Sequence, residues 1–519
     1  MNAATETEVV IVGAGPTGLM LAYELALAGV GTLVLEKLSH RVEQVKGGGI
    51  QPRTAELLEL RGLLEPLLDR LTPHGPAGAP AGGPAGDPAG GHFAFLPVPL
   101  DCTPWATRHP YPIGIPQWEV EAVLEERASA LGARLLRGTP VTGVAQDDGG
   151  VTVTAGPLRI RARYVVACDG GHSTVRKVLG VAFPGRPGTH RAILADIRLS
   201  AASSLVPERR GHMSTMTRRQ GGDWGMLIPL GGDRYRFTFG RVDAADGAGE
   251  EPRDTPVTPE EIGAALRSVY GAETTLGAVE NASRFSDATR QVERYRTGRV
   301  LFAGDAAHIH PPLGGQGLNL GIQDALNLGW KLAATLRDRA PKGLLDSYHA
   351  ERHPVAAQVL HHTSAQRVLA HQNPGEDVAA LRDIVTDLLR LPDANRHVAG
   401  LMSGLSLRYD LPGGHRLTGA RVPDAELTTE AGPRRLSALF RAGHAVLLDL
   451  AGAVPDGLPL PAGIGLTRAG RTDGLDAAAL LLRPDGYVCW ATDDPADLAD
   501  PARTLLPAIA AHLTLPEAR

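Results

Sequence analysis

The chain has 519 residues, of which 43% are hydrophobic, so it is long and apolar enough to form roughly three domains and is not a disordered chain. Its formal net charge of −5 disfavours nucleic acid or an anionic membrane as the partner, which leaves chemistry on small molecules as the leading class. The N-terminus has no basic and apolar leader, no run of about 18 apolar residues occurs, and three widely spaced cysteines form no CxxC. We therefore expect a cytoplasmic protein without a membrane span, a disulfide framework or a zinc site.

The first predicted unit is a strand, a helix and a second strand around the segment GAGPTG at 13–18. In this dinucleotide fingerprint Gly13 makes a tight turn, Gly15 lets the backbone approach a pyrophosphate, and Gly18 packs the helix on the strand. Glu36, at the end of the second strand, would accept hydrogen bonds from ribose hydroxyls and repel a 2′-phosphate. The pattern favours FAD or NAD as the tightly bound nucleotide over a purely structural glycine turn. The sequence contains no second fingerprint of this kind, so we expect one such site.

A second α/β pattern follows. Residues 72–91 are rich in Pro, Gly and Ala and predict a loop. The periodicity then predicts a helix over 118–131 and strands over 139–146, 151–155 and 163–167.

From about residue 191 to 240, strand-like runs around a Gly-Gly-Asp turn predict an antiparallel sheet, which we interpret as a separate substrate-side domain. Trp224 and Met226, in the run WGMLIPL, are candidates for the substrate pocket. A core or surface position on the strand is an equally good interpretation of both residues.

The segment YVVACDGGHSTVRKVLG, at 164–180, is the second motif. A strand ends at Cys168, a turn follows at Asp169, and Ser173 can cap a short helix that carries Arg176. Taken alone, the segment is also compatible with an ordinary turn from a strand into a helix.

The third motif is LFAGDAAHIHPPLGGQGLN, at 301–319, in which a strand delivers Asp305 at its carboxyl end, where ligands bind in open α/β sheets. A carboxylate there can accept hydrogen bonds from ribityl hydroxyls. The loop over 311–317 has few side chains, so its backbone can lie close to a flat ring. A helix that begins near Leu318 and runs to about residue 337 would aim its free N–H groups at the negative charge of a reduced flavin. The alternative is a Gly-Pro loop that only precedes a helix.

His308 and His310 in this motif invite interpretation as metal ligands, but no third ligand is apparent, and loop or helix-start positions are favoured. Helices are expected to continue to about residue 404. The tail then predicts a compact α/β module of about 100 residues, with a strand at AVLLDLAG, two strands around the Pro-Asp-Gly turn of AALLLRPDGYVCWAT, and a final helix near 501–513.

At these residues the sequence resembles the class A FAD-dependent aromatic hydroxylases with the p-hydroxybenzoate hydroxylase fold. It is most similar to the actinobacterial aromatic-polyketide hydroxylases of angucycline and tetracycline type. The resemblance covers nearly the whole chain and rests on the three motifs, on the stretch LGIQDALNLGWKLA that follows the third, and on LLDSYHAERHPVA at 344–356.

The resemblance implies an α/β protein with three parts. They are a Rossmann-like FAD-binding domain over 1–190 and 285–405, an antiparallel-sheet substrate domain over 191–284, and a thioredoxin-like domain over 412–519. Because the last part has no CxxC, we expect it to be redox-silent.

The same resemblance implies site residues. Gly13, Gly15, Gly18 and Glu36 would contact adenosine and pyrophosphate, Gln117 the ribityl and phosphate region, and Asp305 the ribityl chain. Pro312, Gly314, Gly315, Gln316, Gly317 and Asn319 would surround the isoalloxazine. Lys46, where arginine is more usual, and Arg53 would lie close to FAD. Asp169, Gly170 and Arg176 match a motif that serves both FAD and the nicotinamide cofactor.

The function implied is that of a monooxygenase in which NADPH reduces FAD and a flavin C4a-hydroperoxide hydroxylates a polycyclic aromatic polyketide with O2. No side-chain acid or base is obligatory, and the catalytic residues stay unassigned. Three alternatives remain open: a Baeyer–Villiger type insertion on a ketone, a flavin reductase that does not oxygenate its substrate, and a non-catalytic flavin-binding protein. The oligomeric state is not predicted.

Overall fold

The computed structural model describes residues 5–42, 48–71, 91–189, 191–209, 211–241, 255–371, 375–470, 472 and 474–513. Lys46 and the predicted loop over 72–91, except Gly91, lie outside the described residues. None of the helices within these ranges is both long and apolar enough to cross a membrane.

The nucleotide-side sheet has eight strands, six of them in the order β14-β15-β6-β1-β2-β3, with β5 paired to β6 and β4 to β5. β1 is parallel to β2 and β6, and β15 is parallel to β6, so their carboxyl ends share one edge. The strands are β1 (Thr5–Val12), β2 (Thr32–Leu35), β3 (Arg134–Leu136), β4 (Gly143–Asp147), β5 (Gly150–Ala155), β6 (Leu158–Ala167), β14 (Arg296–Thr297) and β15 (Val300–Phe302).

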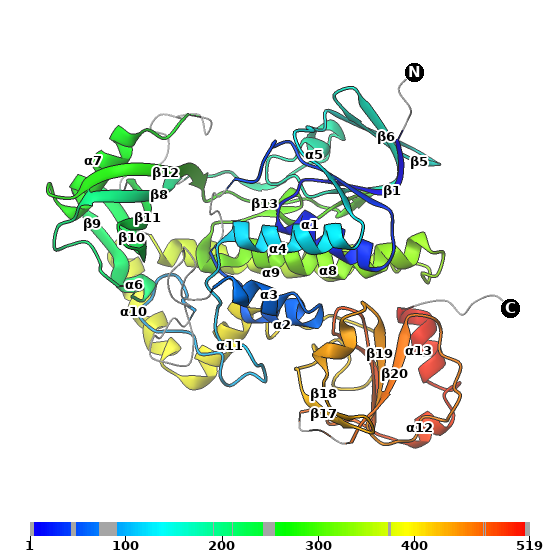
Figure 1. The fold of residues 1–519 in the computed structure, drawn as a ribbon. Helices are drawn as coiled ribbons and strands as arrows, with labels where there is room; N and C mark the ends of the chain where they lie inside the picture. The colour runs from blue at the N-terminus through cyan, green and yellow to red at the C-terminus, as the bar shows by residue number, and fades with distance from the viewer. Residues whose placement is uncertain are drawn as a thin grey trace.

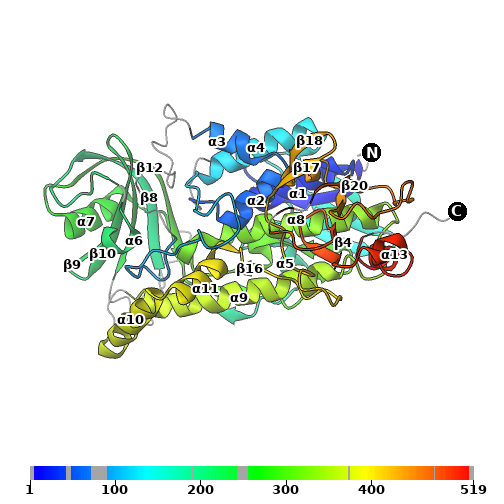
Figure 2. The ribbon, with the colours of Figure 1, turned by 90° about the horizontal axis from the view of Figure 1, so that it is seen from below.

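Helices cover this sheet, and together with it they form the central part of the molecule, which we call the body. They are α1 (Pro16–Leu27), α2 (Pro52–Leu60), α3 (Leu64–Asp69), α4 (Gln117–Ala130), α5 (Thr174–Val178), α8 (Gln316–Leu336), α9 (Ser347–Leu369), α10 (Glu376–Leu389) and α11 (Pro392–Ser403). α1 packs against both α8 and α4, and α8 packs against α9. The long helices α8 and α9 run side by side through the middle of the molecule (Figures 1 and 2).

A five-stranded antiparallel sheet lies at the far end of the molecule from the C-terminal part (Figure 1). Its order is β12-β8-β11-β10-β9, with β8 (Arg191–Ala201), β9 (Thr217–Gln220), β10 (Asp223–Gly231), β11 (Arg234–Arg241) and β12 (Thr275–Ser286). α7 (Pro259–Tyr270) packs on one face of the sheet and shares an apolar core with it. The short helix α6 (Met213–Met216) precedes β9. A small sheet of β7 (Gly185–Arg186), β13 (Thr289–Gln291) and β16 (His308–Ile309) joins the two larger sheets.

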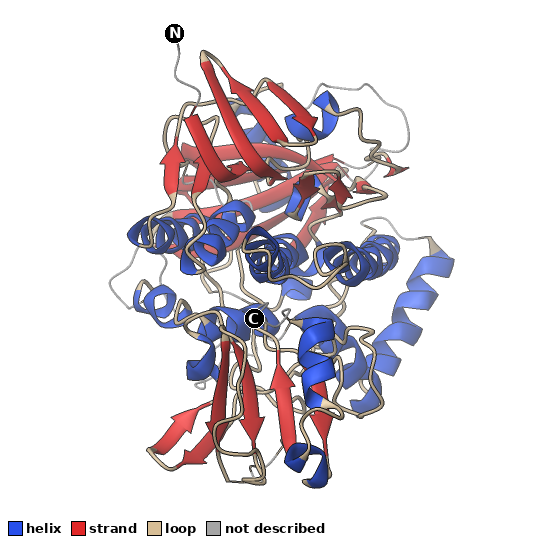
Figure 3. Cartoon of the chain, turned by 90° about the vertical axis from the view of Figure 1, so that its right-hand side faces the viewer, coloured by secondary structure: helices blue, strands red, loops and turns tan. Residues whose placement is uncertain are grey.

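The C-terminal part contains a four-stranded sheet in the order β20-β19-β21-β22. Its elements are β19 (Ala445–Asp449), β20 (Ile464–Arg468), β21 (Ala479–Leu482), β22 (Val488–Thr492), α12 (Ala496–Ala499) and α13 (Leu505–His512), preceded by the hairpin β17 (Glu426–Thr429) and β18 (Gly432–Arg435) and the 3-10 turn η3 (Ser437–Phe440). Figure 3 shows the body helices as a layer between this sheet and the nucleotide-side sheet. Trp330 of α8 belongs to the apolar core of the C-terminal part, so the two parts share a packed boundary.

The predicted mixed α/β class with antiparallel sheets is confirmed, and several element boundaries differ from expectation. The strand predicted over 163–167 already begins at Leu158, and the final helix begins only at Leu505. The strand predicted from residue 139 starts at Gly143, because Pro140 has no N–H to donate to the ladder. The helix α8 starts at Gln316 and not near Leu318, because the first helical residues need no intrahelical N–H partner and tolerate Gly317.

Candidate functional site

The first glycine loop, at 13–18, is closed by backbone contacts. Gly13 has φ +104°, and a Cβ there would overlap the carbonyl of Cys168. A Cβ on Gly18 would overlap the carbonyl oxygen of Gly13, so the helix α1 can approach β1 only with glycine at this position. By contrast, a Cβ on Gly15 would have no heavy atom of the described chain within 4 Å. The loop thus leaves open space beside Gly15, at the helix N-terminus.

Glu36 lies beside this loop. One of its carboxylate oxygens accepts from the N–H of Ala14 at 2.8 Å, and the other accepts from the N–H of Leu38 at 2.9 Å. The side chain is half-buried, and each carboxylate oxygen can accept a further bond, for example from a ribose hydroxyl. Gln117 is the first residue of α4, and its amide donates to Glu121 at 2.8 Å.

Asp169 follows β6 and caps the next turn. One oxygen accepts from the N–H groups of Thr174 and Val175 at 2.7 and 3.2 Å. The other oxygen, Oδ1, is buried and has no hydrogen-bond partner in the described chain. A buried carboxylate oxygen is costly without a donor, so this atom fits a ligand that carries hydroxyl groups.

Arg176 joins the second and third motifs. Its guanidinium donates to the carbonyls of Ala306 at 2.9 Å and Gly171 at 2.6 Å, and it stacks on Phe183 at 3.8 Å. Burial lowers the pKa of this guanidinium. The contacts make Arg176 a link between two loops at the carboxyl edge of the sheet.

The second glycine loop lies at 311–317. Asp305 precedes it, exposed in the 3-10 turn η1 (Gly304–Ala306), and Pro312 is exposed as well. Gly314 and Gly315, in the 3-10 turn η2 (Leu313–Gly315), have φ +72° and +64°, which side chains rarely adopt.

The helix α8 begins directly after this loop. No described side chain caps its N-terminus, which leaves backbone N–H groups available to a negative charge. A Cβ on Gly317 would lie 3.8 Å from Asp305 Oδ1, so the carboxylate and the helix start are neighbours.

Asn319 holds the second loop to a remote segment. Its Oδ1 accepts from the N–H of Gln51 at 2.8 Å, and its amide donates to the carbonyls of Gly49 at 3.1 Å and Gly315 at 2.8 Å. The amide of Gln51 in turn donates to the carbonyl of Gly314 at 3.0 Å, and that of Gln316 to the carbonyl of Met402 at 2.7 Å. Sequence reasoning missed Gln51, because no local pattern marks a bond between residues so far apart.

Arg53 is almost completely buried, with 1% of its surface exposed. Its guanidinium donates to Glu56 at 2.9 Å and to the carbonyl of Asp485 at 3.1 Å, and it stacks on Tyr487 at 4.7 Å. The guanidinium of Arg53 therefore faces the C-terminal part. The backbone of Arg53 directly follows residues 49–51, which contact the second loop. A direct contact with FAD stays a prediction, as does that of Lys46, which lies outside the described residues.

A buried charge cluster lies behind the second loop. His308 Nε2 is 2.7 Å from Asp324, which also accepts from Arg352 Nε at 2.7 Å and from the N–H of Gly304 at 3.1 Å. Burial alone would raise the pKa of Asp324, but the charges of Arg352 and His308 hold it below its ordinary value. His308 is thus placed as a buried partner of a carboxylate.

Trp224 and Met226 project from β10 on the face opposite α7. The alternate residues Gly225 and Leu227 face α7, and Met226 is buried outside the core that the sheet shares with this helix. On the same face as Met226, Arg236 pairs with Asp196 at 2.9 Å, and its Nη1 lies 3.4 Å from the Cβ position of Gly48. This face therefore leads to the segment that Asn319 holds, but a substrate contact of Trp224 and Met226 stays a prediction.

Comparison with known proteins identifies the family. A family model described as "FAD binding domain" matches residues 6–363, and one described as "Aromatic-ring hydroxylase, C-terminal" matches residues 415–512. This chain belongs to the FAD-dependent aromatic-ring hydroxylases. FAD is therefore the cofactor of this protein, and NADPH is the co-substrate typical of its family.

Three similar proteins cover this hydroxylase almost completely. The anhydrotetracycline monooxygenase of Streptomyces rimosus is 46% identical over 503 residues, which are 93% of this chain and 95% of that protein. The solved structure of the OxyS anhydrotetracycline hydroxylase from Streptomyces rimosus is 42% identical, with a TM-score of 0.85 over 99% of this chain and 100% of that one. The structure of the Diels-Alderase PyrE3 is 35% identical, with a TM-score of 0.81 over 98% and 100% of the two chains.

Proposed function

We propose that this protein is an FAD-dependent, NADPH-consuming monooxygenase that hydroxylates a polycyclic aromatic polyketide with O2. The observation that carries the proposal is the identity of 46% over 93% of the chain to a protein named as an anhydrotetracycline monooxygenase. Anhydrotetracycline is a fused-ring aromatic compound, so the substrate class follows from that name.

The residues fit FAD at three places. Gly15 leaves space at the N-terminus of α1, Asp169 Oδ1 is buried without a donor in the described chain, and α8 begins without a side-chain cap from the described residues. When bound, FAD supplies the redox chemistry of hydride acceptance and oxygen activation. The protein has to bind the cofactor, orient the substrate and exclude water.

The N-terminus of α8 gives this site its electrostatic character. A helix N-terminus stabilises nearby negative charge by about 0.3–1 kcal/mol when exposed and by up to about 2 kcal/mol when partly buried. Gly314 and Gly315 expose backbone there, so a flat ring can lie within reach of the N–H groups. We infer that this end of α8 faces the isoalloxazine.

We assign contacts with the cofactors and with the substrate to separate groups of residues. The adenosine and pyrophosphate end is assigned to Gly13, Gly15, Gly18 and Glu36, and the ribityl and phosphate region to Gln117. Asp169, Gly170 and Arg176 are assigned to both FAD and the nicotinamide cofactor. The ribityl and ring end is assigned to Asp305, Pro312, Gly314, Gly315, Gln316, Gly317 and Asn319, with Lys46 and Arg53 nearby. Trp224 and Met226 are assigned to the substrate.

The test is product analysis with isotopically labelled oxygen. The protein loaded with FAD is supplied with NADPH, ¹⁸O₂ and anhydrotetracycline or a related polycyclic phenol. We expect NADPH oxidation stimulated by the polyketide and a product that carries one labelled oxygen on an unbroken ring skeleton. A labelled lactone would mean that the protein catalyses a Baeyer–Villiger insertion and not a hydroxylation.

A second candidate is catalysis of ring formation without oxygen transfer. It is favoured by the similarity to the structure titled as a Diels-Alderase, which covers 98% of this chain. A product of unchanged mass, formed without NADPH from a polyene substrate, would support it and would overturn the monooxygenase proposal.

A further inference from the structure

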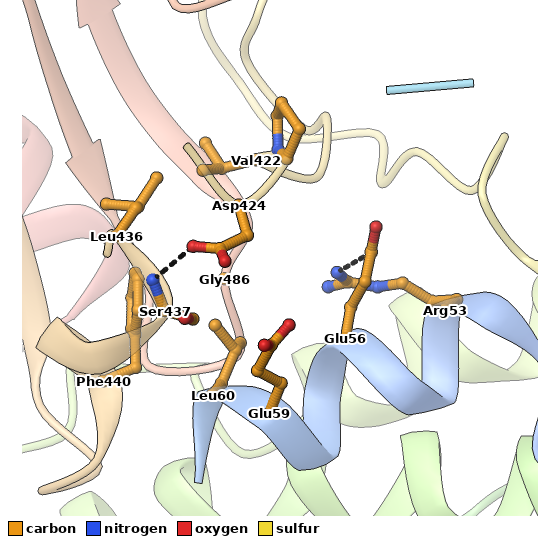
Figure 4. Close-up of a pocket in the computed structure, with 11 residues that line it drawn as sticks. Arg53, Glu56, Glu59, Leu60, Val422, Asp424, Leu436, Ser437, Phe440 and Gly486 are labelled. Atoms are coloured by element: carbon orange, nitrogen blue, oxygen red, sulfur yellow. Dashed lines mark hydrogen bonds and ion pairs between the residues drawn. The ribbon is translucent and has the colours of Figure 1, made fainter. Parts of the chain in front are cut away.

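The turn between β21 and β22, residues 483–487 with the sequence RPDGY, is buried against the helices of the FAD-binding body; we call it the docking turn. Arg483, Asp485 and Tyr487 are each 2% exposed. Gly486 has φ +75°, and a Cβ there would lie 2.9 Å from a methyl of Leu60 on α2. Figure 4 shows this contact region, in which Arg53, Glu56, Glu59 and Leu60 of α2 face the loop that carries Gly486.

The docking turn takes part in a neutral set of buried charges. Arg483 pairs with Glu351 on α9 at 2.8 and 2.7 Å and with Asp485 at 3.0 Å, and Lys331 on α8 pairs with Glu351 at 2.8 Å. Two cations and two anions are therefore removed from water together. Such a set contributes little net stability, but its geometry is strict because every broken pair leaves a buried charge. It fixes where the docking turn lies relative to α8 and α9.

Tyr487, the last residue of the docking turn, contacts Arg53 at the start of α2. Its ring lies under the guanidinium of Arg53 at 4.7 Å, and Arg53 also donates to the carbonyl of Asp485. Arg53 is the second residue of α2, and Gln51 directly precedes this helix. Since Gln51 holds the carbonyl of Gly314, a displacement of Arg53 would move the second glycine loop.

Tyr487 also contacts Tyr409, which leads to the buried charge cluster behind the second glycine loop. Its ring lies 4.3 Å from that of Tyr409, whose hydroxyl accepts from Arg352 at 3.2 Å. Arg352 pairs with Asp324, which accepts from the N–H of Gly304 beside Asp305. The ring of Tyr487 thus contacts Arg53 directly and Arg352 through Tyr409. These arginines lead to Gly314 in the second glycine loop and to Gly304, which precedes it.

We propose that the docking turn is a positioning element for the flavin, with Tyr487 as its central residue. It acts through Arg53 and Arg352 on Gly304 and on the second glycine loop that follows, and it does not touch the cofactor. This role gives the C-terminal part a function in the monooxygenase, although the part carries no CxxC. The inference rests on the proposed assignment of the second glycine loop to the isoalloxazine.

The test compares Tyr487→Leu with Tyr487→Phe and with Trp490→Leu in the full-length protein. Trp490 lies in β22, the strand that begins directly after Tyr487, and within the described chain its ring is stacked on neither Arg53 nor Arg352. The readout is the FAD dissociation constant of the apoprotein, measured by flavin fluorescence, together with the apoprotein melting temperature. Neither needs substrate or oxygen, so failure of the proposed hydroxylation would leave this test intact.

We expect Tyr487→Leu to raise the FAD dissociation constant by about 3- to 30-fold, the range that a lost buried cation–π contact covers. Tyr487→Phe keeps the ring and should restore wild-type affinity, and Trp490→Leu should leave affinity unchanged even where it lowers the melting temperature. An unchanged constant in Tyr487→Leu, an equal rise in Trp490→Leu, or no rescue by Tyr487→Phe would each overturn the proposal.

Arg53→Lys supplies a second route to the same answer. Lysine keeps a charge for Glu56 but loses the planar group that stacks on Tyr487. If Arg53 acts through the docking turn, the double variant with Tyr487→Leu should bind FAD no more weakly than the weaker single variant. Additive losses would mean that Arg53 contacts the cofactor by itself and would contradict the proposal. Should Tyr487→Leu fail to fold, unchanged affinity in Arg53→Lys would overturn it.

Discussion

The two glycine-rich loops of the site are held in different ways. The loop at 13–18 is closed by its own backbone, because Gly18 packs directly on the carbonyl of Gly13. The loop at 311–317 is held by side chains from other parts of the chain, chiefly Gln51 and Asn319. The closure of the first loop is therefore mostly local, although Gly13 also packs on the carbonyl of Cys168, whereas the second loop is held by side chains that are remote in the sequence.

The largest expected effect comes from alanine at Gly18. A methyl group there would overlap a backbone oxygen, so α1 and β1 would have to separate, at a cost of about 3 kcal/mol or more, the upper end of the range for overpacking. We expect a lower apoprotein melting temperature and loss of FAD from the purified protein.

Gly15→Ala is the matched comparison for this change. Its methyl group would meet no heavy atom of the described chain within 4 Å, and the φ of −77° suits alanine. The apoprotein should therefore melt as the wild type does, while FAD affinity falls at least about tenfold because the methyl group fills the space assigned to the pyrophosphate. Equal stability losses in both variants would contradict the distinction between the packing glycine and the ligand-facing glycine.

Asn319→Ala is expected to have the next largest effect, on the second loop. It removes three hydrogen bonds that join Gly49, Gln51 and Gly315, and it should destabilise the protein by about 1–3 kcal/mol. FAD affinity should fall with it, as measured by fluorescence titration.

Asn395→Ala provides the control, because this residue also makes three backbone hydrogen bonds, to Pro99, Asp101 and Leu389. It should reduce stability without changing FAD affinity. An equal loss of FAD affinity in both variants would show that the second loop responds to general destabilisation and not to the loss of the hydrogen bonds of Asn319.

The difference between the loops also explains what the sequence could predict. GAGPTG lies between a strand and a helix that are adjacent in the chain, so residue order defines the turn and the packing of Gly18 on Gly13, while the contact of Gly13 with Cys168 comes from the tertiary fold. For the second loop, the sequence predicted bare backbone and a following helix, but not the bond between Gln51 and Asn319, which are 268 positions apart. Arg53 illustrates the limit most clearly, because the family resemblance predicts that it lies close to FAD, while its guanidinium binds a carbonyl 432 positions away.

A more gradual effect is expected from pH, and it should concern the second loop. Burial lowers the pKa of His310, at the start of this loop, and of His362 on α9 to about 4 in each case. In the unfolded chain both would titrate near about 6.5. Between these values the unfolded state binds protons that the folded state does not, so stability decreases as the pH falls from about 6.5 to about 4.

We expect this loss, measured by urea unfolding at several pH values, to be on the order of 3–7 kcal/mol for the pair, because lowering the pKa of each histidine from about 6.5 to about 4 corresponds to about 3 kcal/mol. His362→Gln should flatten the profile without removing it, since His310 and the half-buried His92, with a pKa of about 4, would still contribute. A profile unaffected by this substitution would mean that His362 does not titrate as its burial requires.

The smallest effect is expected from Asp305→Ala, which tests one hydrogen bond of the second loop. Asp305 is exposed, and its carboxylate lies beside Gly317 at the start of α8. If it accepts from a ribityl hydroxyl, its loss should raise the FAD dissociation constant by about 3- to 10-fold, as one hydrogen bond of about 0.5–1.5 kcal/mol implies. Asp393→Ala, in the exposed first turn of α11, should change nothing. Asp305 follows a strand of the same sheet as the first loop, so its position does not depend on Gln51 and Asn319. An unchanged dissociation constant would mean that Asp305 does not bind the ribityl chain, which would leave this contact to residues that Gln51 and Asn319 hold in place.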